Sequence, residues 1–121
     1  MNGSFLSTNV VTYTTTPLMI ACAYNRRDIV AYLISFSDEI NINFQDEILG
    51  NTPLMISALH GYHEIVKILL QLPNIDVNLS RNESGDNDTS LHLATKFGQL
   101  DVFLELLAHP KINAGKSNKV P

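Results

Sequence analysis

The chain has 121 residues, of which 45% are hydrophobic and 17% are charged, a balance that fits one compact domain and excludes a disordered chain. Eight lysines and arginines stand against twelve aspartates and glutamates, so the net charge of −4 argues against binding to nucleic acid or to acidic membranes. The apolar runs are too short to span a bilayer, and the single cysteine, Cys22, excludes an internal disulfide and a cysteine-based zinc site.

A six-residue pattern occurs three times along the chain. It reads Thr-Pro-Leu-Met-Ile-Ala from residue 16, Thr-Pro-Leu-Met-Ile-Ser from residue 52 and, more loosely, Thr-Ser-Leu-His-Leu-Ala from residue 89. Each copy continues with an acid, two apolar pairs and a closing Ile-Asn or Val-Asn step. The acids are Asp28, Glu64 and Asp101, and the closing asparagines are Asn43, Asn78 and Asn113. Three copies in one register indicate a repeat protein.

The first part of each copy is predicted to be a short helix. The threonine that opens the pattern is a good N-cap, and Pro17 and Pro53 occupy the first helical position, where a missing N–H costs nothing. Gly61 and Gly98 stand where this helix has to end with a residue at positive φ. Asn25, the next most tolerant residue type, occupies the same place in the first copy.

The second part of each copy is predicted to be another helix, which opens on the acid of the repeat. A carboxylate in the first turn interacts favourably with the positive end of the helix dipole. In the middle copy, an apolar stripe is so wide that this helix needs cover on more than one side; it is formed by Ile65, Val66, Ile68, Leu69 and Leu70. Because such short helices are not stable alone, we expect neighbouring copies to stack and bury these stripes. The polar segments 45–51 and 80–88 are expected to project as β-hairpin-like loops.

The order of Thr-Pro-Leu, helix, Gly, helix, Leu-Leu and Asp-Val-Asn closely resembles the ankyrin repeat. The resemblance is best for the middle copy, residues 51–78, and covers roughly residues 15–118. It implies an all-α, ankyrin-repeat solenoid of stacked helix–turn–helix units with projecting β-hairpin-like loops. It also implies a protein that binds other proteins and carries no chemistry of its own.

The resemblance further implies how the chain is divided. Phe103 and Leu104, in the last second helix, are both apolar where the end of an array should present polar residues. We therefore expect either a segment of a longer array or larger protein, or a short array whose apolar end is covered by another element or pairs end to end. The predicted parts are an N-terminal extension at 1–14, three repeats at about 15–47, 48–84 and 85–118, and the possible start of a further repeat at 119–121.

In proteins of this family the partner usually lies in the concave face formed by the loop tips and by the ends of the first helices. Aromatic and large apolar residues in such a shallow groove are typical of binding hot spots. As an alternative, Leu59 and Phe97 only pack against neighbouring helices, and Ile48 and Leu49 fold under their loop. The predicted partner contacts are Tyr24, Ile48, Leu49, Leu59, His60, Lys96 and Phe97, with Thr12 and Tyr13 at a further loop tip.

No pattern of catalytic or metal-binding residues stands out. His60 and His63 lie on either side of a helix-ending glycine, so they should not share one helical face for a metal. Cys22 stands between two alanines and is expected to be a buried, inert side chain. The sequence has no phosphate-binding glycine-rich loop and no His-Glu-x-x-His motif. We therefore expect no enzyme, no cofactor, no metal, no nucleic acid and no membrane contact.

The family resemblance implies roles for two polar side chains. His92 is the only copy of the histidine that the family places after Thr-Pro-Leu, and it is expected to bridge loops by hydrogen bonds. Asn78 is expected to bond the backbone of the loop leading into the hairpin. Its position is also one that ankyrin-like substrates offer to an asparaginyl hydroxylase.

The sequence therefore predicts a scaffold that binds a partner protein through the concave face of its repeats. The alternative is a substrate-recruiting or regulatory module of a larger enzyme or of a secreted bacterial effector. The first residues lack the basic start and long apolar stretch of a secretory signal. We accordingly expect an intracellular, cytoplasmic location, or the cytosol of a host if the chain belongs to an effector.

Overall fold

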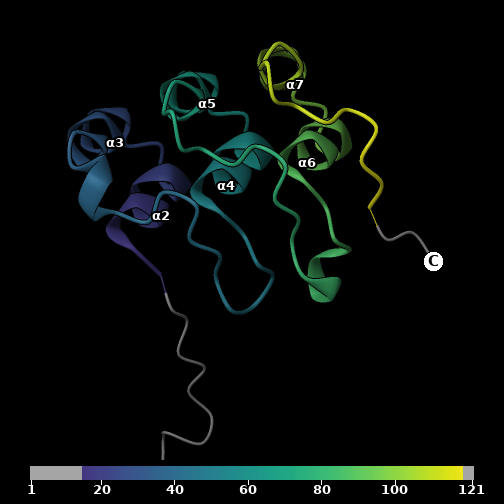
Figure 1. The fold of residues 1–121 in the computed structure, drawn as a ribbon, viewed down its shortest axis with the longest axis horizontal. Coiled ribbons are helices and arrows are strands. Elements are labelled where there is room, and N and C mark those ends of the chain that lie inside the picture. The colour runs from purple at the N-terminus through teal and green to yellow at the C-terminus, as the bar shows by residue number, and fades with distance from the viewer. Residues whose placement is uncertain (1–14, 119–121) are drawn as a thin grey trace, which may run out of the picture.

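The computed structural model describes residues 15–118, in which three pairs of helices lie side by side. The first helices of the pairs form one layer and the second helices form another (Figure 1). The first layer holds α2 (Pro17–Ala23), α4 (Pro53–His60) and α6 (Ser90–Lys96), and the second holds α3 (Arg27–Ile34), α5 (His63–Leu70) and α7 (Leu100–Leu107). The predicted all-α stack of helix–turn–helix units is confirmed. The predicted segments 1–14 and 119–121, with Thr12 and Tyr13, lie outside the described residues.

The helices of the first layer begin where the sequence predicts. The side-chain oxygens of Thr16, Thr52 and Thr89 accept hydrogen bonds from the backbone N–H three residues on, at 3.2, 3.1 and 3.3 Å. Each bond satisfies one N–H group that the helix itself cannot pair. At the other end, Asn25, Gly61 and Gly98 all have positive φ, between 58° and 75°, as expected for residues that reverse the chain.

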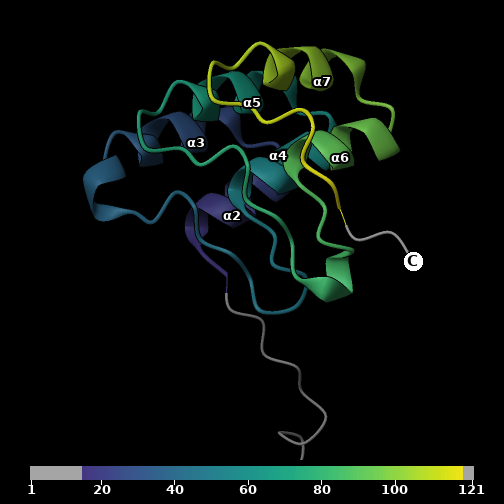
Figure 2. The ribbon, with the colours of Figure 1, turned by 45° about the vertical axis from the view of Figure 1, so that its right-hand side comes forward.

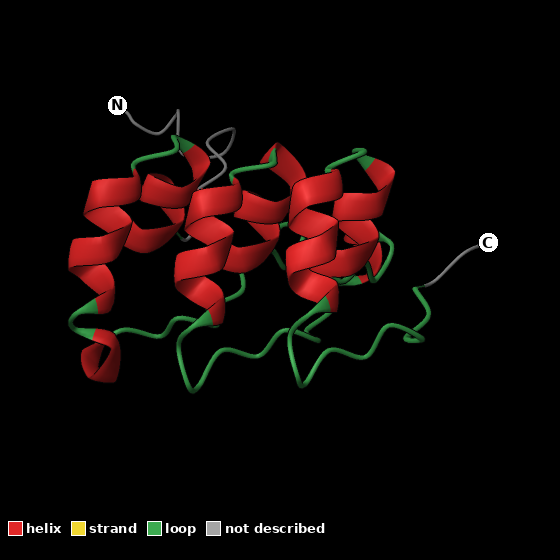
Figure 3. Ribbon diagram, turned by 90° about the horizontal axis from the view of Figure 1, so that it is seen from above, coloured by secondary structure: helices red, strands yellow, loops and turns green. Residues whose placement is uncertain are grey.

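The helices of the second layer have no side-chain hydrogen bond at their N-caps, which are residues 26, 62 and 99. Each has the predicted acid in its first turn, where a carboxylate compensates the positive end of the dipole. The three helices run alongside one another (Figure 3).

The core lies between the two layers and between successive pairs. In α5, the side chains of Ile65, Val66 and Leu69 are fully buried. Helix α5 contacts α4 below it and both α3 and α7 beside it, so the wide apolar stripe is covered on several sides, as predicted. Stacking of neighbouring repeats thus removes from water what a single helix pair would leave exposed.

The connections between pairs project away from both layers and lie side by side (Figure 2). They differ from regular β-hairpins, because the only bridge between strand-like residues in the described part of the chain joins Ser80 and Thr89. The connections contain two 3₁₀ turns instead, η1 (Ser37–Glu39) and η2 (Glu83–Gly85). In the range 15–118, no helix is long and apolar enough to cross a membrane.

Candidate functional site

Three aromatic side chains follow one another at the ends of the first-layer helices. Tyr24, His60 and Phe97 occupy equivalent positions in the three repeats, immediately before the residue with positive φ. The side chain of Tyr24 is 66% exposed and that of Phe97 is 57% exposed. His60 is also exposed, and its ring stacks on Tyr62 with the ring centroids 5.2 Å apart. We call Tyr24, His60 and Phe97 the aromatic row.

Leu59, the predicted contact beside the aromatic row, is half-buried. Its carbonyl oxygen accepts a hydrogen bond from Gln99 Nε2 of the next repeat at 3.0 Å. Leu59 therefore contributes to the junction between repeats as well as to the surface, whereas Tyr24 and Phe97 remain largely in solvent.

The loop at residues 45–51 is organised by one carboxylate. Asp46 accepts hydrogen bonds from four consecutive backbone N–H groups, those of Ile48, Leu49, Gly50 and Asn51, at 2.9 to 3.2 Å. Aspartate side chains commonly close turns by accepting hydrogen bonds from backbone N–H groups a few residues further on. The result is a closed loop that presents Ile48 as an exposed apolar side chain and leaves Leu49 half-buried.

The loops of neighbouring repeats are hydrogen-bonded to each other. Asn82 donates from its backbone N–H to Leu49 O at 2.9 Å and from its side-chain amide to Ile48 O at 3.1 Å. Gln45 donates to Ser80 O across the same gap at 2.8 Å. Ile48 and Leu49 are therefore held in place from both sides.

Lys96 joins the loop of the third repeat to the end of α6. Its ammonium group lies 2.7 Å from a carboxylate oxygen of Asp88 and 3.6 Å from one of Asp86. The Asp88 side chain is almost completely buried and also accepts a hydrogen bond from Asn118 at 2.7 Å. The hydrogen bond to Asp88 raises the pKa of Lys96 above its ordinary value. Lys96, predicted as a partner contact, thus has a structural role as well.

The Lys96 side chain, at the last residue of α6, reaches back to Asp88 at the base of loop 80–88. A side-chain bond between Arg81 Nε and Asn51 Oδ1, 2.7 Å long, links the two bases. The bases of the two loops are therefore joined to each other, and loop 80–88 is joined to α6 as well.

Sequence reasoning missed the residues that support this face. Asp46, Gln45, Arg81 and Asn82 hold the loops but make no repeating pattern. The one available signal was Asp46 itself, an aspartate two residues before an apolar pair and a glycine, which is typical of a turn closed by its side chain.

The histidines and the cysteine are engaged in structural contacts. Cys22 is fully buried, as predicted, and burial raises the pKa of its thiol to about 11, so the reactive thiolate is scarce at neutral pH. His63 Nε2 lies 3.0 Å from Glu105 Oε1, across the gap between α5 and α7. Within residues 15–118, no three His, Cys, Asp or Glu side chains are grouped so as to hold a metal.

The expected role of His92 is corrected by the structure. Its Nδ1 accepts a hydrogen bond from the backbone N–H of Thr89 at 2.9 Å and also lies 3.0 Å from the hydroxyl of that residue. The ring therefore caps the start of its own helix, because it stands three residues after the N-cap. Asn78 bonds backbone as expected, donating to Lys111 O and accepting from the N–H of Asn113 in the following repeat, both at 2.8 Å.

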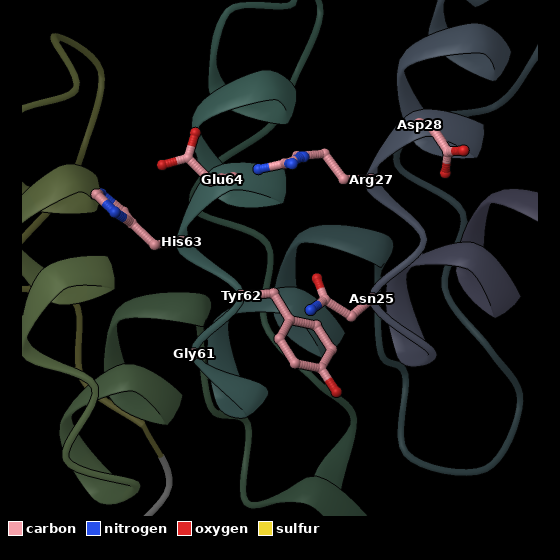
Figure 4. Close-up of a pocket in the computed structure, with 7 residues that line it drawn as sticks. All are labelled: Asn25, Arg27, Asp28, Gly61, Tyr62, His63 and Glu64. Carbon is pink, nitrogen blue, oxygen red and sulfur yellow. The ribbon is translucent and has the colours of Figure 1, made fainter.

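A groove of about 570 Å³ lies between the starts of α3 and α5. Figure 4 shows Arg27 reaching from α3 toward Glu64 of α5, while Asp28 points away. Both signs of charge line this groove, so it favours neither a cation nor an anion. Its lining residues are Asn25, Arg27, Asp28, Gly61, Tyr62, His63 and Glu64.

Stacked helix pairs with hydrogen-bonded loops along one face define a helical repeat protein. A family model described as ankyrin repeats, in three copies, matches residues 3–81 and 38–118. The chain therefore belongs to the ankyrin repeat family.

Several known proteins contain a region that is similar in sequence to this chain. Alpha-latroinsectotoxin-Lt1a of Latrodectus tredecimguttatus is 32% identical over 87 residues, which are 72% of this chain and 6% of the toxin. The putative ankyrin repeat protein FPV031 of Fowlpox virus (strain NVSL) is 36% identical over 80 residues, or 65% of this chain and 22% of that protein. The chain thus spans less than a quarter of either relative.

A solved structure has the same fold. It is described as the Bd0816 predatory endopeptidase from Bdellovibrio bacteriovorus in complex with immunity protein Bd3460. The match has a TM-score of 0.68 and 30% sequence identity, and it covers 80% of this chain and 47% of the matched chain.

Proposed function

We propose that this chain is a scaffold that binds a partner protein on the face formed by the aromatic row and loop 45–51. Ankyrin repeats generally mediate interactions between proteins, through the extended surface that stacking creates. The observation that carries the proposal is the exposure of Tyr24 and Phe97 at equivalent positions of the stack. Aromatic side chains are the commonest anchors of protein interfaces.

The support beneath these side chains favours the same function. Asp46 and Asn82 fix the loop that carries Ile48 and Leu49, so little conformational entropy is lost there when a partner docks. Lys96 adds a positive charge at the edge of the aromatic row and remains 44% exposed in its side chain. The proposed contacts are Tyr24, Ile48, Leu49, Leu59, His60, Lys96 and Phe97.

A second candidate is a module that recruits a substrate or regulates activity within a larger enzyme or a secreted effector. The small share of each curated relative that this segment covers favours it. The matched structure is that of an endopeptidase complex with an immunity protein, which supports a protein as the partner in either case. For both candidates we propose a cytoplasmic location.

The test removes the two exposed rings and leaves the stack intact. Tyr24→Ala combined with Phe97→Ala is compared with Leu104→Ala, which deletes an exposed apolar side chain of α7 in the other layer. Each protein is immobilised, challenged with lysate of the source organism, and its thermal unfolding is recorded. We expect the unchanged chain and the Leu104 variant to retain the same partner, and the double variant to lose it with an unchanged melting temperature. Retention of that partner by the double variant would exclude the aromatic row as the binding site.

A further inference from the structure

The two ends of the stack expose positions that are buried inside it. The position of Ile29 is occupied by Ile65 in the second repeat and Val102 in the third, where it is 0% and 1% exposed. In the first repeat, which has no preceding repeat among the described residues, Ile29 is 48% exposed. This position therefore faces the preceding repeat. Ile20 and Tyr32 are likewise more exposed than the residues at their positions in the second and third repeats, and we call Ile20, Ile29 and Tyr32 the head face.

The opposite end shows the converse pattern. Val30 and Val66 are fully buried, whereas their equivalent in the third repeat, Phe103, is only half-buried. Leu100 and Leu107 are exposed beside it. An apolar groove of about 250 Å³ lies here, between α6 and α7, with Leu100 and Phe103 in its lining. We call Leu100, Phe103 and Leu107 the tail face.

The contacts inside the stack show what would meet at these ends. His63 of the second repeat faces Glu105 of the third, and their side chains are joined by a hydrogen bond of 3.0 Å. One repeat further on, the position of His63 is taken by Leu100, 65% exposed on the tail face. The position of Glu105 in the first repeat is taken by Tyr32, 69% exposed on the head face. Leu100 at the tail end and Tyr32 at the head end therefore occupy the positions of His63 and Glu105, and both are largely apolar.

An equivalent hydrogen bond joins each repeat to the one before it, and its donor and acceptor positions are also left unpaired by the described stack at its two ends. Tyr62 donates from its hydroxyl to Ala23 O at 3.5 Å, and Gln99 donates from its amide to Leu59 O at 3.0 Å. In each case the residue before the second helix reaches back to the end of the preceding first helix. The next members of the series are Arg26, an exposed donor at the head end, and the carbonyl of Lys96 at the tail end.

We propose that the tail face of one molecule docks on the head face of a second copy, in the register of the internal repeats. The interface continues the packing between repeats, with Leu100 against Tyr32 and with Arg26 donating to the carbonyl of Lys96. Head-to-tail contacts use two different surfaces, so the association does not close at a dimer and produces open chains. The aromatic row and the loops stay free for the partner in each copy.

The test blocks one face at a time. Tyr32→Glu places a charge on the head face and Leu100→Glu places one on the tail face, both at exposed positions. Analytical ultracentrifugation over a wide range of concentration should show growing oligomers for the unchanged chain and monomers for each variant alone. An equimolar mixture of the two variants still has one intact head and one intact tail, so it should form a one-to-one dimer and nothing larger.

Gln71→Glu is the matched control, since it places the same charge at an exposed residue at the end of α5, in the middle repeat and away from both end faces. It should assemble like the unchanged chain. A chain that stays monomeric at every concentration would overturn the proposal. So would a mixture of the two variants that forms no dimer, or a Gln71 variant that dissociates as fully as the Leu100 variant. Circular dichroism confirms that each variant is folded.

Discussion

The second repeat and the first repeat place the same residue types in different surroundings. Ile65 and Ile29 are both isoleucines at one position of the second helix, but Ile65 is fully buried and Ile29 is about half exposed. The difference comes from the neighbouring repeat and not from the residue or its helix. In a stacked protein, each repeat is stabilised mainly by the interfaces with its neighbours. Stability should therefore be greatest in the middle of the stack and decrease toward both ends.

The largest expected effect is that of removing the buried isoleucine. Ile65→Ala should lower the free energy of unfolding by about 2–5 kcal/mol, because it deletes a fully buried side chain and leaves a cavity. Ile29→Ala, the matched variant, should cost less than about 1 kcal/mol, since half of that side chain is already in water. Urea unfolding at a concentration where the chain is monomeric measures both. Equal losses would contradict the role assigned to the neighbour.

The next effect concerns the loop between the first and second repeats. Asp46→Ala should cost about 1–3 kcal/mol, because the backbone N–H groups of residues 48–51 lose their acceptor. Hydrogen exchange at these amides should become faster. Asp38→Ala, at an exposed acid in η1, serves as the control and should leave both quantities nearly unchanged.

Two glycines with the same backbone conformation offer a sharper form of the comparison. Gly98→Ala should cost about 1–2 kcal/mol from its positive φ alone, because nothing lies near the added methyl group. At Gly61 the methyl group would also clash with the Gln99 side chain of the next repeat and displace its hydrogen bond to Leu59. Gly61→Ala should therefore be more destabilising by about 1 kcal/mol.

If urea unfolding showed that Gly61→Ala lowers the free energy of unfolding by less than Gly98→Ala does, the Gln99 contact would contribute nothing to the junction between repeats.

The smallest effect concerns Cys22, which belongs to the first repeat but faces the second. Its thiol stays protonated in the folded chain up to about pH 11, whereas an unfolded thiol loses its proton near pH 9.0. The protonated thiol therefore contributes stability below pH 9, and this contribution is lost as the pH rises from about 9 through about 11. Stability of the unchanged chain should fall more steeply over this range than that of Cys22→Ala.

Alkylation gives an independent measure of the same burial. At pH 8, iodoacetamide should modify Cys22 slowly in the folded chain and quickly in urea. Rapid modification without denaturant would mean that the first and second repeats are not closely packed at this point.

Local features of the fold could be predicted because they depend on a few neighbouring residues. The N-caps at Thr16, Thr52 and Thr89 and the positive φ of Asn25, Gly61 and Gly98 follow from backbone chemistry within one turn. The repeat period predicts the same caps and chain reversals at nearly equal spacing. From this spacing the stack of helix pairs and the row of helix ends could be predicted.

The support of the candidate surface could not be predicted, because it depends on contacts between distant residues. The hydrogen bonds of Asn82 to residues 48 and 49, and of Gln45 to Ser80, join positions more than thirty residues apart. The ion pair of Lys96 with the buried Asp88 is equally specific to one repeat. Which predicted contacts bind a partner stays a prediction, since the structure establishes only the exposure of these side chains and the hydrogen bonds of the loops.

The difference between the middle and the ends of the stack is tested most directly by native-state hydrogen exchange of the isolated, monomeric chain. The amides of α4 and α5, which have a neighbour on each side, should exchange most slowly. Those of α2 and α3 at one end, and of α6 and α7 at the other, should exchange faster. End helices that exchange as slowly as α5 would contradict the claim that neighbouring repeats determine the burial and stability of each unit.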